Sequence, residues 1–279
     1  MLFFTTVGGL LISILAVLVS LLLEGGGGGG LFSLSALIIV LGGTVGATIM
    51  SHSTDELRRL PSVTLLAFGK GLQDRLATAR LLLEFSEIVR RQGVLALEER
   101  ARQITDPYLK QAVSLLMDGT DSQGIESFLR TNAQLYREDV ERSAQVFQTA
   151  GGYAPTMGII GTVMGLVHVL GNLSEPDQLG GAIATAFLAT FYGVASANLI
   201  WLPLGNKIRA VVQEIVLYRR MVAEAVLAIQ RGEPRVLLEE RLALYAGTQL
   251  NEDAGAPAAE GVKPASAGTP ATRQVNEPL

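Results

Sequence analysis

The sequence predicts an all-α integral membrane protein with four transmembrane helices and a helical cytoplasmic domain. Only 17% of the 279 residues are charged, against about 25% in a typical soluble chain. Residues 1–54 hold a single charge, and residues 143–174 and 178–206 hold none. Between these stretches apolar residues recur at helical spacing, and no segment alternates as a strand does. Together these patterns indicate helices in and beside a membrane.

The four predicted spans follow from length. A helix needs about 20 apolar residues to cross the hydrocarbon layer. Segments 2–23 and 31–50 meet this requirement, as do stretches within 149–173 and 179–205. We interpret the first segment as a retained span rather than a signal peptide, because no basic residue precedes it and no small-residue cleavage site follows it.

Basic residues predict the orientation. All 22 lysines and arginines lie in residues 51–142 or 207–279, whereas the short loops at 24–30 and 174–178 carry only acidic charges. Loops rich in lysine and arginine remain in the cytoplasm. We therefore expect both termini and the large middle segment to be cytoplasmic.

These patterns divide the chain into five regions. They are a transmembrane hairpin (1–50), a helical cytoplasmic domain (51–142), a second pair of spans (143–206), cytoplasmic helices (207–250) and a tail (251–279). The tail is rich in alanine, proline, glycine and serine, and we expect it to be disordered because it has few large apolar side chains to bury.

Several helix boundaries can be predicted. Gly93 interrupts a helical pattern, and Asp106-Pro107 is typical of a helix start, with aspartate as the cap and proline in the first turn. A helix beginning near Asp121 meets no strong breaker and should continue into the third span. The fourth span should likewise continue to about Gln230.

The composition excludes several function classes. The chain has no cysteine and two histidines, so a metal centre or cysteine nucleophile is not expected. No nucleophile–base pair is recognisable, so we do not expect an enzyme. A net charge of −4 offers no basic surface for nucleic acid. The spans contain no Asp, Glu, Lys or Arg, so this chain lacks the carboxylate that a proton relay normally uses. His168 is either a hydrogen-bonded neutral histidine or a relay group.

Small and hydroxyl residues form a helical stripe on the last two spans. Such a stripe favours close helix packing, and a functional path is the alternative. Its members are Gly158, Gly161, Thr162, Gly165, Ala182, Thr185, Ala186, Ala189, Thr190, Gly193 and Ala197. Pro155 and Pro203 lie at similar depth in these spans, as tolerated kinks or as a hinge.

These residues carry a family resemblance. The run 154–166, the run 186–193, Ala197-Asn198 and Pro203 resemble the channel domain of the MotA/TolQ/ExbB proton channel family. The resemblance covers residues 1 to about 245 in architecture and is specific over 150–209. Two spans before the large cytoplasmic block favour the flagellar stator branch.

The resemblance implies a stator subunit in a bacterial inner membrane. Five copies would surround two copies of a MotB-like, single-span, peptidoglycan-binding subunit that supplies the ion-binding aspartate. Ion flow would then drive torque on the flagellar rotor, with no cofactor and with membrane lipid outside. The family pattern implies an ion pathway along Gly158, Thr162, Thr185, Ala186 and Thr190, with Pro155 and Pro203 as conformational prolines.

A further match lies in the cytoplasmic domain. Arg90 and Glu98 resemble the charged pair with which the family contacts a rotor torque-ring protein of the FliG type. A solvated helix face is the alternative interpretation of these charges.

The transported ion stays open between proton and sodium. Thr162 and the Tyr192-Gly193 pair resemble the sodium branch of the family, and threonine hydroxyls are hard oxygen ligands of the kind sodium needs. Two other functions remain: an energiser of outer-membrane processes, as in the ExbB and TolQ branches, and a non-conducting membrane scaffold.

Overall fold

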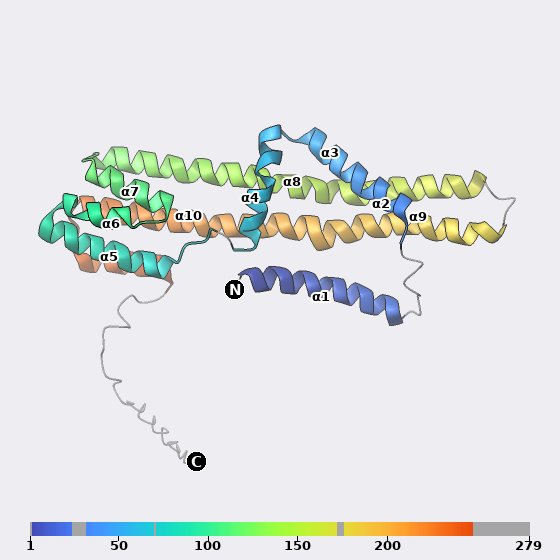
Figure 1. Ribbon diagram of the computed structural model, residues 1–279, viewed down its shortest axis with the longest axis horizontal. Coiled ribbons are helices and arrows are strands. Elements are labelled where there is room, and N and C mark those ends of the chain that lie inside the picture. Colours follow the sequence, from blue (N-terminus) through green and yellow to red (C-terminus); the bar gives the residue numbers. More distant parts are fainter. Residues whose placement is uncertain (1, 24–31, 70, 172–175, 248–279) are drawn as a thin grey trace, which may run out of the picture.

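The computed structural model describes residues 2–23, 32–69, 71–171 and 176–247, which form helices and no strands. Helix α8 (Ser122–Gly171) runs the length of the molecule (Figure 1). Beside it, α9 (Pro176–Ser196), the π-helical turn η4 (Ala197–Trp201) and α10 (Leu202–Gln230) return in the opposite direction. Both long helices predicted to extend out of the last two spans are confirmed.

Three helical segments are long and apolar enough to cross a membrane: Leu34–Ser51, Ser122–Gly171 and Leu179–Gln230. The first consists of α2 (Leu34–Leu37), the π-helical turn η2 (Ile38–Gly42) and α3 (Gly43–Ser51). The remaining expected span forms α1 (Leu2–Leu23), whose described apolar stretch Phe4–Ser20 falls short of that length. A fourth crossing therefore stays a prediction.

Helix α1 touches the rest of the molecule near one end. The Thr6 hydroxyl donates to the Ala67 carbonyl at 2.9 Å, and Lys207 Nζ donates to the Thr5 hydroxyl at 3.0 Å. Most of its other side chains are apolar and exposed. The expected loop at 24–30 and the tail 251–279 lie outside the described residues.

Helix α4 (Thr54–Ala67) crosses the long hairpin where its apolar half ends (Figure 1). Ser53 and Glu56 form a capping box at its start. The ring of His52 bridges Glu56 Oε2, at 2.9 Å from Nδ1, and the Thr149 hydroxyl, at 3.0 Å from Nε2. The hydrogen bond from His52 lowers the pKa of Glu56. This bridge fixes the end of α3 to α8.

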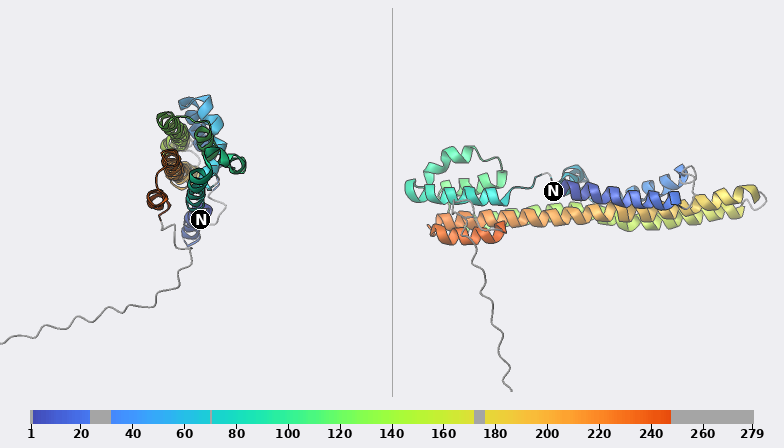
Figure 2. Two further views of the ribbon diagram at one scale, coloured as in Figure 1. Left: turned by 90° about the vertical axis from the view of Figure 1, so that its left-hand side faces the viewer. Right: turned by 90° about the horizontal axis from the view of Figure 1, so that it is seen from below.

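A helical lobe packs against α8 and α10 at the end of the molecule opposite the apolar half of the hairpin (Figure 2). It comprises α5 (Arg75–Gln92), the 3-10 turn η3 (Val94–Leu97), α6 (Glu98–Arg102), α7 (Pro107–Met117) and α11 (Arg235–Ala246). Its apolar core includes Leu82, Phe85, Leu97, Leu129 and Met221, all fully buried. Burial of such side chains is the main driving force for packing the lobe.

Two predicted helix boundaries in the lobe are confirmed. Gly93 ends α5 with a φ of 85°, a value that favours glycine. Asp106 caps α7 by accepting from the amides of Tyr108 and Leu109, and Pro107 occupies the first turn. The same carboxylate accepts from the Tyr218 hydroxyl at 2.5 Å, so one side chain both starts α7 and ties it to α10.

Candidate functional site

The predicted small-residue stripe forms the contact between α8 and α9. Gly158 lies so close to α9 that an added Cβ would be 2.8 Å from the Ala189 carbonyl oxygen. A Cβ on Gly161 would meet the Ala189 Cβ at 2.6 Å, and one on Gly165 would meet the Ala186 Cβ at 2.6 Å. Glycine is required here because the two backbones are in contact. Helix packing is therefore one role of the stripe.

Within this contact, the two threonines singled out from the sequence meet. Thr162 Oγ1 and Thr190 Oγ1 lie 2.5 Å apart. The Thr162 oxygen is also 3.1 Å from the Gly158 carbonyl oxygen and 3.0 Å from that of Ala186. The Thr190 oxygen is 3.5 Å from the same Gly158 carbonyl oxygen, so two hydroxyls and two carbonyls form one group of four oxygens. We call Thr162, Thr190 and these two carbonyls the oxygen cluster.

Oxygen ligands of this kind can coordinate a sodium ion, or can hydrogen-bond to a water molecule that relays a proton. The side chains of Gly158 and Ala186 cannot contribute to either process, because one is a hydrogen and the other is buried against α8. Their contribution to the oxygen cluster is the backbone carbonyl. Both threonines are half-buried.

Thr185 lines a cavity of about 390 Å³ between the second span and the hairpin, and Ala186 lines it as well. Ala36 and Ile39 line one wall of it, and His168 lines another part together with Thr185. The structure thus brings Thr162 and Thr190 together, whereas Thr185 and His168 share this cavity instead.

The second span closes the site on another side, which the sequence did not indicate. Ala36 and Val40 pack on Ala189, and the Tyr192 hydroxyl accepts from the Ser33 amide at 3.1 Å. Thr44 is fully buried in α3, and its hydroxyl has no hydrogen-bond partner among the described residues. Alternating small and hydroxyl residues in the second span were the signal that could have indicated this face.

The two prolines lie in different local environments. Pro155 is half-buried inside α8, which continues through it although the Gly151 carbonyl loses its amide donor. Pro203 is exposed in the first turn of α10, directly after the π-helical turn η4. A π-helical turn in a helix is a common place for local rearrangement. Neither π-helical turn, η2 nor η4, was predicted.

Arg90 and Glu98 lie at the opposite end of the molecule, in the lobe. Arg90 is in the last turn of α5 and Glu98 begins α6, with Gly93 and η3 between them. Both are exposed, and Glu98 accepts from Arg102 at 2.8 Å. Surface ion pairs of this kind contribute little to stability. Among the described residues, no group of acidic or histidine side chains could hold a metal ion.

Comparisons with known proteins agree with this architecture. A family model described as the MotA/TolQ/ExbB proton channel family matches residues 100–221. The chain is 31% identical over 214 residues to Motility protein A of Bacillus subtilis, covering 76% of this chain and 78% of that protein. It is 31% identical over 204 residues to Chemotaxis protein PomA of Vibrio alginolyticus, covering 73% and 80%.

Solved structures show the same fold. The flagellar MotAB stator complex from Bacillus subtilis contains a chain with a TM-score of 0.81 and 28% identity, covering 86% of this chain and 95% of that one. C. jejuni MotAB gives a TM-score of 0.82 at 28% identity, with 87% and 95% covered. The family motif in the hairpin, the shared fold and the extent of these matches lead to one conclusion: the chain belongs to the MotA/TolQ/ExbB proton channel family.

Proposed function

We propose that this chain is the channel-forming stator subunit of a bacterial flagellar motor, converting ion flow across the inner membrane into torque. The observation that carries the proposal is the oxygen cluster, which lies in a helical hairpin whose sequence holds no charge over residues 143–174 and 178–206. Relatives named Motility protein A and solved MotAB stator complexes support it.

In this proposal a MotB-like subunit supplies the acid that the spans lack. Two copies of that single-span, peptidoglycan-binding partner would be surrounded by five copies of this chain. Both termini and the lobe would be cytoplasmic, in agreement with the distribution of basic residues. The ion would pass between the carboxylate of the partner and the oxygen cluster.

The torque would be passed to the rotor at the opposite end of the molecule, in the lobe. Binding and release of the ion would change the helix geometry near Pro155 and Pro203, where backbone hydrogen bonds are already interrupted or shifted. Helices α8 and α10 extend from the apolar half of the hairpin into the lobe, so a movement there would be passed through the lobe to Arg90 on α5 and Glu98 on α6. These charges would contact a rotor protein of the FliG type, an electrostatic contact that salt weakens.

Co-purification tests the assembly. We expect the chain, co-expressed with the single-span protein of an adjacent gene, to form a five-to-two complex measurable by native mass spectrometry. Deleting the gene for this chain should leave flagella assembled but stop their rotation. If no such complex forms and swimming continues after deletion, the stator proposal is wrong. A partner whose periplasmic domain binds an outer-membrane receptor would instead support the energiser function.

The identity of the transported ion can be tested separately. We propose sodium, because Thr162 adds a second hydroxyl to that of Thr190 and sodium must replace its lost water ligands with such oxygens. We expect swimming speed to fall close to zero when external sodium is replaced by potassium at fixed pH. An unchanged speed, with loss of swimming on addition of a protonophore, would assign the proton instead.

A further inference from the structure

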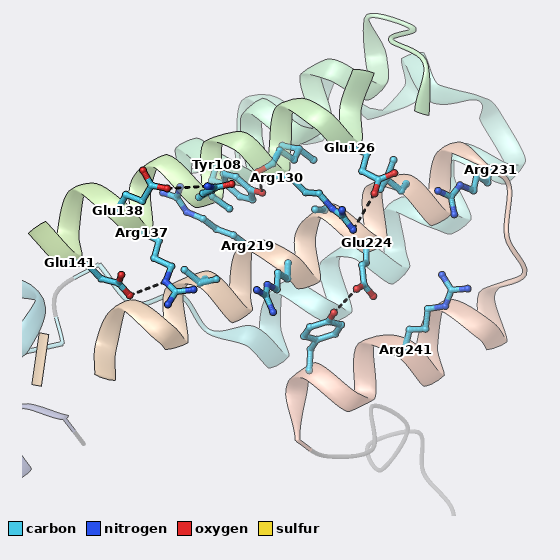
Figure 3. A pocket seen from close by; sticks show the side chains of 18 residues that line it. Tyr108, Glu126, Arg130, Arg137, Glu138, Glu141, Arg219, Glu224, Arg231 and Arg241 are labelled. Atoms are coloured by element: carbon cyan, nitrogen blue, oxygen red, sulfur yellow. Dashed lines mark hydrogen bonds and ion pairs between the residues drawn. The ribbon is translucent and has the colours of Figure 1, made fainter. Parts of the chain in front are cut away.

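A charged groove lies between α8, α10 and α11 (Figure 3). Its lining includes no residue of the oxygen cluster and neither Arg90 nor Glu98. Its volume is about 870 Å³, within the range of roughly 300–1,000 Å³ found for small-molecule sites. Six arginines line it, five of them on α8, α10 and α11 and Arg231 directly after α10: Arg130, Arg137, Arg219, Arg220, Arg231 and Arg241. We call it the Arg219 groove.

The carboxylates that line the groove already have partners within this chain. Four glutamates line it, and each has a partner from this chain. Glu126 pairs with Arg130 at 3.2 Å, Glu141 with Arg137 at 2.8 Å, Glu138 with Gln134 at 2.9 Å, and Glu224 with the Tyr245 hydroxyl at 2.5 Å.

The arginines of the groove are only partly paired. Arg231 and Arg241 both pair with Glu233. Among the described residues, Arg219 and Arg220 have no carboxylate within 4.0 Å. With Glu233 counted beside the four lining glutamates, the six arginines leave one positive charge in excess.

Arg219 is held rigidly in place. Its guanidinium lies over the ring of Tyr136, 3.8 Å from the centroid, and over that of Tyr108 at 4.7 Å. Nη1 donates to the side-chain and main-chain oxygens of Asn132, at 2.9 and 3.3 Å. Tyr108 is itself fixed, because its hydroxyl donates to the Leu129 carbonyl at 3.1 Å and burial raises its pKa to about 12.

Most of the hydrogen-bonding capacity of Arg219 remains open. A guanidinium has five N–H donors. Within the described part of the chain, the Nε and Nη2 donors have no hydrogen-bond acceptor. Arg219 is half-buried with oriented donors, and its opposite charge, Asp106, lies beyond ion-pair distance, so an anion in the groove would stabilise it. Orienting the donors in advance also lowers the entropy lost when a ligand binds.

We propose that the Arg219 groove binds a small phosphate-bearing anion, with Arg219 and Arg220 as its main donors. Arginine forks match the geometry of phosphate oxygens and donate two parallel hydrogen bonds to them. The volume admits a ligand of nucleotide size, and the arginines of the other helices lie around it. Nucleotides and inorganic polyphosphate share this chemistry.

Isothermal titration calorimetry of the purified full chain tests the site, with pyrophosphate and ATP as probes at constant ionic strength. We expect saturable binding. Arg220→Gln, at an exposed position, should weaken pyrophosphate affinity about tenfold without affecting folding, because it removes one charge-assisted contact. Arg219→Lys, which keeps the charge but not the fork, should weaken it by a similar factor. The matched control is Arg58→Gln, an exposed arginine of α4 outside the groove.

Each outcome decides the proposal. Equal affinity for pyrophosphate and ATP supports it and indicates inorganic polyphosphate, whereas tighter ATP binding supports it and indicates a nucleotide. Non-saturable heats, or equal effects of Arg220→Gln and Arg58→Gln, would overturn it. So would a change in oligomer size with Arg220→Gln in the absence of phosphate binding, which would make the groove a contact between copies. Binding is measured without ion flow, so failure here leaves the stator proposal untouched.

Discussion

Replacing Gly193 by alanine is expected to stop swimming. An added Cβ at this position would lie 2.5 Å from the Ala154 carbonyl oxygen and 3.1 Å from the Gly158 Cα. Both atoms belong to the backbone of α8, so the helices themselves would have to separate. Overpacking of this kind costs about 1–3 kcal/mol. Separation would also pull Thr190 away from Thr162, so we expect the loss of most rotation, measured as swimming speed.

Two other glycines provide matched controls for this change. Gly180 lies on the same helix and Gly152 on the facing one, and an added Cβ at either would have no heavy atom within 4 Å. Alanine at these positions should leave swimming and the membrane level of the protein unchanged. Normal swimming with Gly193→Ala would show that α8 and α9 are not held at this distance in the working motor.

Thr190→Val should reduce motor speed about tenfold while leaving the protein folded. Valine has nearly the shape of threonine but no hydroxyl, so the Thr162 hydroxyl loses its 2.5 Å partner and the oxygen cluster loses a ligand. A hydrogen bond of this kind contributes about 0.5–1.5 kcal/mol, and 1.4 kcal/mol corresponds to a factor of ten. Speed of tethered or bead-labelled flagella at constant load is the measurement.

This substitution separates a packing role from a role in ion passage. If the stripe serves packing alone, valine should be tolerated because it fills the same space. Thr190→Ser, which keeps the hydroxyl, should retain most of the speed in our proposal. Thr156→Val is the control on α8, because that hydroxyl is exposed and donates only to the Tyr153 carbonyl. Equal speeds for Thr190→Val and Thr156→Val would contradict a role for the oxygen cluster.

The long helices could be predicted because their signals are local. Uninterrupted helical spacing predicted α8, and the chain from the fourth span to Gln230 contains no residue that ends a helix except where Pro203 occupies a first turn. Gly93 and Asp106-Pro107 act within a few residues of themselves, so the ends of α5 and α7 followed directly from residue type.

The Arg219 groove and the wall of the site formed by the second span could not be predicted in the same way. Arg219 stacks on Tyr108 and Tyr136, which are 111 and 83 positions away in the sequence. Tyr192 contacts Ser33 across 159 positions. No periodicity relates such residues, and their proximity depends on how the helices pack.

The sequence by itself determined the helices, the charge-free segments and the absence of an acid from the spans, because these depend on composition and on neighbours within a turn or two. Only the tertiary structure decided that Thr162 and Thr190 share an oxygen cluster while Thr185 lines a neighbouring cavity together with His168. The physical reason is the backbone contact at Gly158 and Gly193, which fixes the rotation of α8 against α9 and thereby the direction in which each threonine points.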